Sequence, residues 1–154
     1  MQTSSFVSIG WKIVLLMGIY LIVISLIQIF SAEAMFSGEF EAFTGDSWSD
    51  YVANSAKPAE LFLINQRIIG ASMFIIGLLA ALIAWKSYSR AEKWSWYALL
   101  VAGVLGWGTM LTYYIVISYL VSTTLVLWII GAGLFVVGLA LPAKAILGGK
   151  SSKE

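Results

Sequence analysis

Three polar residues in succession, Asn65, Gln66 and Arg67, interrupt an otherwise apolar stretch of the chain. A charge inside a membrane-spanning helix is a candidate functional site, because lipid solvates it poorly. Glu60 precedes Arg67 by seven residues and so falls on the same helical face. Because the arginine fork pairs well with phosphate, carboxylate and carbonyl oxygens, these residues predict a site for a lipid or a quinone.

Further polar residues are predicted at a similar depth in neighbouring helices. Gln28 stands near the end of the first apolar segment. Thr112 and Tyr113 stand near the end of the third, with Tyr114 next in the chain. If these side chains converge, they form a small polar pocket that opens outward. The candidate ligand-binding residues are Arg67, Gln28, Asn65, Gln66, Glu60, Thr112 and Tyr113.

A structural interpretation of the same residues is the stronger one. The side chain of Arg67 can extend to the lipid head groups or pair with Glu60. Asn65 and Gln66 can form hydrogen bonds to neighbouring helices. In that case the polar cluster holds the helices together and binds nothing.

The residue types that are missing restrict the chemistry further. The chain of 154 residues has no cysteine, which excludes disulfides, thiolate catalysis and iron–sulfur clusters. It has no histidine, which excludes a haem ligand, a typical copper or zinc site and the commonest general base. A formal net charge of +1 argues against a nucleic-acid partner. We therefore expect a non-catalytic protein with no cofactor and no metal site.

Long charge-free segments predict how these residues are positioned. Residues 13–32, 68–85 and 94–143 contain no charged side chain, and the last segment is long enough for two membrane crossings. The fold class expected is all-α: a four-transmembrane-helix antiparallel bundle forming a single domain over residues 1–154. The predicted spans are residues 9–30, 58–85, 94–119 and 122–141, the last of them stopped by Pro142.

Charges outside the spans predict the orientation. The outer loop, residues 31–57, and the start of the next span carry Glu33, Glu39, Glu41, Asp46, Asp50 and Glu60 against Lys57. The inner loop, residues 86–93, and the tail, residues 142–154, carry Lys86, Arg90, Lys93, Lys144, Lys150 and Lys153 against Glu92 and Glu154. Short basic loops stay on the cytoplasmic side, so both termini are expected in the cytoplasm.

Aromatic residues recur at helical spacing in the outer loop and predict short helices at the membrane surface. The residues concerned are Phe36, Phe40, Phe43, Trp48 and Tyr51. The stronger interpretation is that they pack against their own bundle. The second is that they form a docking surface for a partner protein.

Two segments carry a resemblance to a known group of proteins. One is Asn-Gln-Arg-Ile-Ile-Gly at residues 65–70, and the other is the basic, Trp-rich turn at residues 88–97. Over residues 60–115 the chain resembles small uncharacterised four-helix membrane proteins of bacteria and archaea, many of them DoxX-like. The residues that match the pattern are Arg67, Gly70, Arg90, Glu92, Lys93, Trp94 and Trp96. The resemblance implies a prokaryotic cytoplasmic membrane and a role as an accessory subunit.

Two functions are therefore expected. The first is a non-catalytic accessory or structural subunit of a larger membrane complex, in contact with lipids and with other subunits or further copies of itself. Many glycine and alanine residues in the spans suit such helix packing. The alternative is a lipid- or quinone-binding membrane protein that uses the polar pocket around Arg67.

Overall fold

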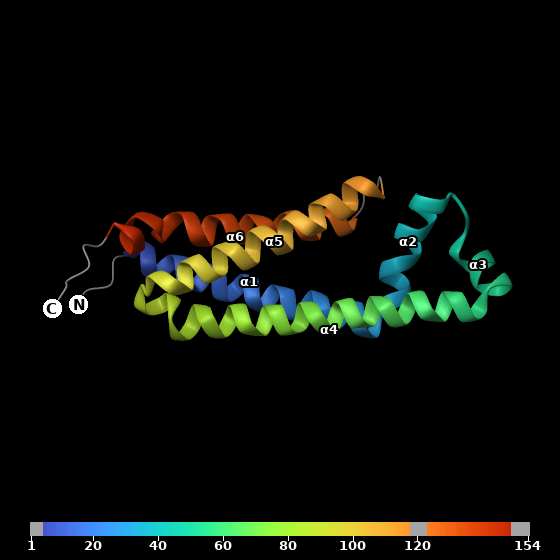
Figure 1. The fold of residues 1–154 in the computed structure, drawn as a ribbon, viewed down its shortest axis with the longest axis horizontal. Coiled ribbons are helices and arrows are strands. Elements are labelled where there is room, and N and C mark those ends of the chain that lie inside the picture. The colour runs from blue at the N-terminus through green and yellow to red at the C-terminus, as the bar shows by residue number, and fades with distance from the viewer. Residues whose placement is uncertain (1–4, 118–122, 149–154) are drawn as a thin grey trace.

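The computed structural model describes residues 5–117 and 123–148, and in these residues every regular element is a helix (Figure 1). The elements are α1 (Ser5–Phe30), α2 (Ala32–Thr44), α3 (Trp48–Asn54), α4 (Ala56–Lys86), the short 3₁₀ helix η1 (Tyr88–Arg90), α5 (Lys93–Val116) and α6 (Thr123–Leu147). Within this described part of the chain, four helices are long and apolar enough to cross a membrane, in α1, α4, α5 and α6. The all-helical class is thus confirmed. The predicted turn between spans three and four falls on residues 118–122, outside the described residues.

Helix α1 lies between α4 on one side and α6 on the other. Gly18 of α1 and Gly77 of α4 face each other so closely that a Cβ on Gly18 would lie 2.9 Å from the Gly77 carbonyl oxygen. Small residues permit this approach, and close van der Waals packing is a main source of helix association in lipid. The glycines predicted as packing positions therefore bring α1 and α4 into backbone contact.

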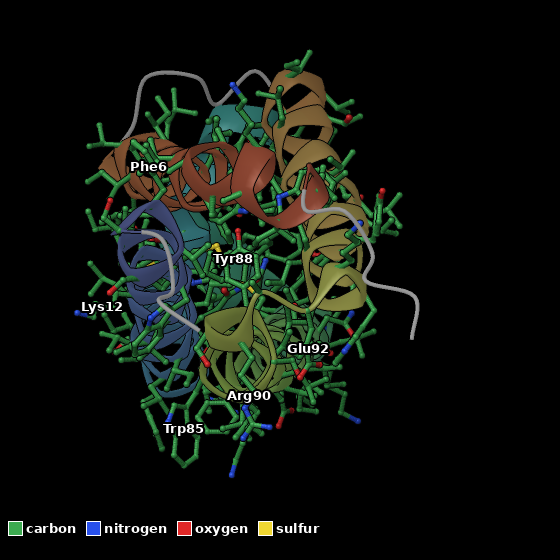
Figure 2. The ribbon with its side chains drawn as sticks, turned by 90° about the vertical axis from the view of Figure 1, so that its left-hand side faces the viewer. Phe6, Lys12, Trp85, Tyr88, Arg90 and Glu92 are labelled. Carbon is green, nitrogen blue, oxygen red and sulfur yellow. The ribbon has the colours of Figure 1, made fainter. Side chains whose placement is uncertain are left out.

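Helix α6 continues through Pro142 to Leu147, whereas the sequence predicts a stop at the proline. Pro142 has no N–H, so the carbonyl oxygen of Gly138, four residues earlier, loses its usual helical donor. The hydroxyl of Tyr88 donates to that oxygen at 3.0 Å. Tyr88 points into the middle of the bundle from the turn between α4 and α5 (Figure 2). A donor from another segment therefore allows the helix to accommodate the proline.

Helix α5 is the least covered of the four long helices, and its main contact is with α6. The ring of Phe135 lies against Gly103, and Trp107 packs edge-on against Trp128 with ring centroids 5.5 Å apart. Toward α4, the side chains of α5 leave space in the half of the bundle nearer α2. This space positions the site described below.

The predicted loop helices lie at the end of the bundle that carries α2. Helix α2 lies across this end, and α3 lies beside the part of α4 that extends beyond the bundle (Figure 1). Phe40 and Trp48 are buried against each other, with ring centroids 5.1 Å apart, and Phe36 and Tyr51 pack around them. Phe43 is 65% exposed. Four of the five aromatic residues of the proposed docking surface thus pack on their own chain.

Loop carboxylates hold these short helices in place. Glu41 accepts a hydrogen bond from the backbone N–H of Trp48, the first residue of α3 (3.2 Å). Glu33 accepts one from the indole N–H of the same tryptophan (3.1 Å). A carboxylate at a helix N-terminus is favourable because the first N–H groups lack helical acceptors. These two acids therefore have structural partners.

Candidate functional site

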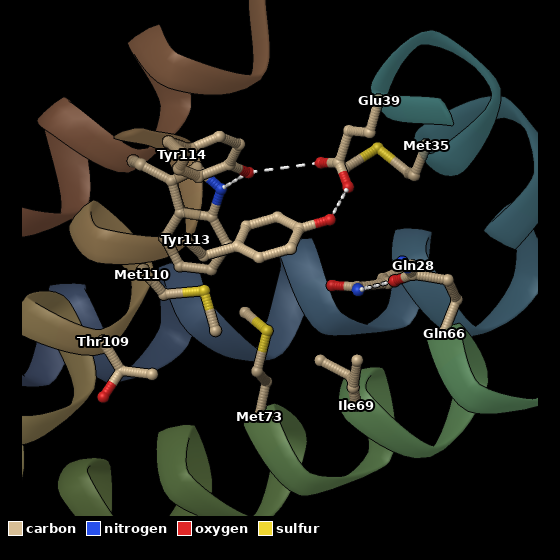
Figure 3. A pocket seen from close by; sticks show the side chains of 11 residues that line it. Gln28, Met35, Glu39, Gln66, Ile69, Met73, Thr109, Met110, Tyr113 and Tyr114 are labelled. Atoms are coloured by element: carbon tan, nitrogen blue, oxygen red, sulfur yellow. Dashed lines mark hydrogen bonds between the residues drawn. The ribbon is translucent and has the colours of Figure 1, made fainter. Parts of the chain in front are cut away.

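A cavity of about 220 Å³ lies between α2 and the long helices (Figure 3). All four long helices and α2 contribute to its walls. The lining residues are Gln28, Met35, Glu39, Gln66, Ile69, Met73, Thr109, Met110, Tyr113, Tyr114 and Trp128. Most of this lining is apolar. Apart from Thr109, whose hydroxyl donates to the backbone oxygen of Leu105 within α5, the polar side chains fall into two sets.

The first polar set surrounds Glu39, which α2 brings over the cavity and which is only 8% exposed. The hydroxyl of Tyr113 donates to the Glu39 carboxylate at 2.9 Å, and that of Tyr114 donates to its other oxygen at 3.4 Å. The indole N–H of Trp128 donates in turn to the hydroxyl of Tyr114. One carboxylate thus connects α2 with α5 and, through a tyrosine, with α6.

Burial raises the pKa of Glu39 above its ordinary value, while the hydrogen bonds from Tyr113 and Tyr114 lower it in part. Among the described residues, no lysine or arginine lines the cavity. The hydrogen-bond donors to Glu39 are therefore neutral, and none of the described lining residues supplies an opposite charge.

The second polar set is the pair of amides from α1 and α4. Gln28 and Gln66 are both buried, and the Gln28 amide donates to the Gln66 side-chain oxygen at 2.8 Å. This is the one hydrogen bond that the described structure gives to either side-chain amide. Each amide offers two donors and one acceptor, so most of their hydrogen-bonding capacity remains at the cavity wall.

Apolar side chains fill the rest of the lining and extend it. Met35, Met73 and Met110 are flexible and polarizable, and such residues adapt to different ligand shapes. A smaller apolar cavity of about 70 Å³ shares Met73, Met110 and Trp128 with the first and continues toward Leu21. The two spaces together suit a molecule with a polar head and an apolar tail.

The structure brings together only part of the predicted ligand-binding set. Gln28, Gln66 and Tyr113 line the cavity, as does Tyr114. Asn65, Arg67 and Glu60 are exposed on α4 and do not line it. Successive helical residues differ in direction by about 100°, so neighbours in the triplet cannot all face inward.

Thr112 lies apart from the cavity as well. It lines a shallow hollow on the exposed side of α5, and its hydroxyl donates to the backbone oxygen of Gly108 at 2.9 Å. Such a bond within one helix satisfies the hydroxyl locally and leaves it little to offer a ligand.

Glu39 is not among the site residues predicted from the sequence. In the sequence it stands among the aromatic residues of the loop and resembles a charged position on a surface helix. The available signal is that Met35 and Glu39 are four residues apart and share a face of α2, next to the face of Phe36 and Phe40. That pattern does not reveal that the Met35–Glu39 face covers a cavity, because α5 and α6 lie far along the chain.

No protein-family model, no curated protein and no solved structure matches this chain. The resemblance to DoxX-like membrane proteins therefore stays a prediction from the sequence.

Proposed function

We propose that this chain is a prokaryotic integral membrane protein that binds a lipid-soluble ligand in the cavity beneath α2. In this proposal the four long helices cross the cytoplasmic membrane as an antiparallel bundle, with both termini in the cytoplasm and α2 on the outer side. The distribution of charge supports this orientation, because the acidic segments lie around α2 and α3 and the basic turn lies at η1.

The observation that carries the proposal is a pair of buried polar sets facing an otherwise apolar cavity. Buried polar groups are costly unless they are hydrogen-bonded, and within a membrane span they mark functional sites by default. Gln28 and Gln66 retain unused donors and acceptors there, and Glu39 carries a buried carboxylate. Ligand pockets have this character: mostly apolar, with a few polar groups that orient the ligand.

A photolabelling experiment tests whether the cavity is occupied. The full-length chain in lipid nanodiscs is irradiated with a diazirine derivative of dodecanol, and labelled residues are located by mass spectrometry. We expect label at Met35, Met73 and Met110, which face the cavity from three helices. Label confined to lipid-facing residues, such as Ile75, would contradict the proposal.

A matched pair of variants strengthens this test. Met73→Trp places a large ring in the cavity and is expected to abolish labelling at Met35 and Met110. Ile75→Trp places the same ring on an exposed position of the same helix and is expected to leave the labelling unchanged. Equal labelling in both variants would mean that the label does not enter through the cavity.

A second candidate function is the accessory subunit expected from the sequence, and a separate observation favours it. At Gly106 and Gly108 of α5 and Gly133 of α6, an added Cβ would meet no atom of the described residues within 4 Å. Exposed small residues on apolar helices allow the close approach of another helix. In this function, α5 and α6 would pack against a larger membrane protein or a second copy of the chain.

The packing of a partner is tested by purification from the native membrane in a mild detergent. The wild-type chain is expected to migrate as a stable complex, and Gly133→Leu to release it as a monomer. Val137→Leu, at an exposed position one turn away, serves as the matched control and keeps the complex. A wild-type monomer would exclude this second function.

A further inference from the structure

The charge of the cavity restricts the head group that it can accept. Glu39 is the one ionisable acid or base, tyrosines aside, among the described lining residues, and Arg67 lies outside the cavity on the exposed side of α4. An anionic phosphate or carboxylate would meet a carboxylate without a compensating cation. Because an unpaired buried charge is costly, the cavity disfavours anionic lipids.

The hydrogen-bonding groups of the cavity wall restrict the chemistry of the head group further. Both carboxyl oxygens of Glu39 accept hydrogen bonds from tyrosine hydroxyls, so Glu39 presents acceptor lone pairs to the cavity and favours a head group that carries a donor such as a hydroxyl. On the other wall, the amides of Gln28 and Gln66 still offer both donors and an acceptor. Figure 3 shows the Glu39 set and the amide pair as separate groups around the same space. A head group with one or two hydroxyls can therefore bond to either wall.

Size selects among hydroxylated head groups. An apolar cavity of about 150 Å³ holds a benzene ring. The cavity under α2, at about 220 Å³, therefore has room for one six-membered ring with small substituents, and it is too small for a phospholipid head group with two chains. The adjoining space toward Leu21 and Trp107 continues it in the apolar direction, where the tail of such a molecule would lie.

We infer that the ligand is an uncharged amphiphile whose head is a single ring bearing a hydroxyl donor, with the hydroxyl on Glu39 and the tail directed toward Trp107. This inference rests on the proposed function and specifies its ligand. A phenolic lipid and a hydroquinone lipid share the required chemistry. They differ in the second hydroxyl, which only the hydroquinone can offer to Gln28 and Gln66.

A matched series of probes tests the inference by competition with the diazirine-dodecanol label on the wild-type chain in nanodiscs. 4-Decylphenol has the ring and the donor, 4-decylanisole lacks only the donor, and 4-decylbenzoate carries a negative charge. A hydrogen bond to a charged group contributes about 1.5–3 kcal/mol. We therefore expect 4-decylphenol to compete at least about tenfold better than 4-decylanisole, and 4-decylbenzoate not to compete.

Variants assign this preference to particular side chains. In Glu39→Gln the advantage of 4-decylphenol over 4-decylanisole should shrink to about threefold or less. 4-Decylbenzoate should remain a poor competitor, because none of the described lining residues supplies a cation. Glu60→Gln and Arg67→Gln, both at exposed positions of α4, should keep the wild-type order. Persistence of the wild-type advantage of 4-decylphenol in Glu39→Gln would overturn the role of Glu39.

The amide pair and the source of the ligand are tested in the same assay. Decylhydroquinone should compete better than 4-decylphenol if the natural ligand is a hydroquinone, and equally if it is a monophenol. Gln66→Leu should remove any such advantage, whereas Asn65→Leu, at the exposed neighbouring position, should not.

Two outcomes would overturn the inference and leave the proposed function standing. One is that 4-decylanisole competes as well as 4-decylphenol, and the other is that 4-decylbenzoate competes best. A cavity that takes no label at all would overturn both.

Discussion

A carboxylate oxygen of Glu39 lies 2.9 Å from the hydroxyl of Tyr113, which follows it in the chain by 74 residues. This bond, with the one from Tyr114, joins α2 to the end of α5 across the cavity. Glu39 therefore has two functions in the geometry. It lines the candidate ligand site, and it holds the helix that covers that site.

The first prediction concerns the pH dependence of this contact. Burial raises the pKa of Glu39, so Glu39 binds a proton more readily when α2 lies over the cavity than when α2 moves away and Glu39 faces water. The arrangement with α2 over the cavity should therefore be fully favoured below the ordinary pKa of 4.5, and it should become less favoured as the pH rises through the raised pKa. Spin labels at Ala42→Cys and Val116→Cys would report the distance between α2 and α5.

The control for this measurement is Glu39→Gln, which cannot titrate. The distance distribution should broaden with rising pH in the chain with Glu39 and stay constant in the variant. The absence of native cysteine means that the labels attach only at the chosen positions. The same pH response in both proteins would show that another group is responsible.

The second prediction concerns the contact between α1 and α4. In Gly18→Ala the new Cβ would lie 2.8 Å from the backbone nitrogen of Ala81 and 2.9 Å from the Gly77 oxygen. Backbone atoms cannot move aside unless the helices separate, so the substitution should lower the free energy of unfolding by about 1–3 kcal/mol. Gly133→Ala, where the added Cβ has no neighbour within 4 Å among the described residues, should leave the free energy of unfolding unchanged or raise it by up to about 1 kcal/mol. Unfolding in mixed detergent micelles, followed by circular dichroism, measures the free energy of unfolding of both variants. An equal decrease in the two variants would refute the close contact.

The third prediction concerns the carbonyl group that Pro142 leaves without a helical donor. Tyr88→Phe removes the hydrogen bond to Gly138 and should destabilise the protein by about 1–3 kcal/mol. In a Pro142→Ala background the alanine N–H can supply the missing helical bond, so Tyr88→Phe should lower the free energy of unfolding by a smaller amount. A double-mutant cycle measures the difference. If Tyr88→Phe lowered the free energy of unfolding equally in both backgrounds, the hydroxyl of Tyr88 would not be the donor that replaces the helical bond to this carbonyl.

The fourth prediction concerns the proposed orientation in the membrane. Asp50→Cys, at an exposed position of α3, should react with a membrane-impermeant maleimide in intact cells. Ser89→Cys, in the turn between α4 and α5, should react only after the cells are permeabilised. The reverse pattern would place α2 and the cavity on the cytoplasmic side.

The sequence by itself determined the class of the protein. Segments without charge and about 20 residues long can satisfy their backbone in lipid only as helices, so an all-helical chain with four candidate spans follows from composition. The sequence also predicted that Gln28 and Tyr113 stand at a similar level in neighbouring helices, and both line the cavity. Glycines in the spans indicated close packing, although not which helices would meet.

Only the tertiary structure decided which side chains share the cavity. Gln66 faces inward and Arg67 outward, and the choice depends on the direction from which α1 and α5 approach α4. The burial of Glu39 likewise depends on Tyr113, a partner remote in sequence. Local periodicity specifies which residues share a face of one helix. The neighbour that covers this face is set by packing between segments far apart in the chain, and this packing leaves no local signal.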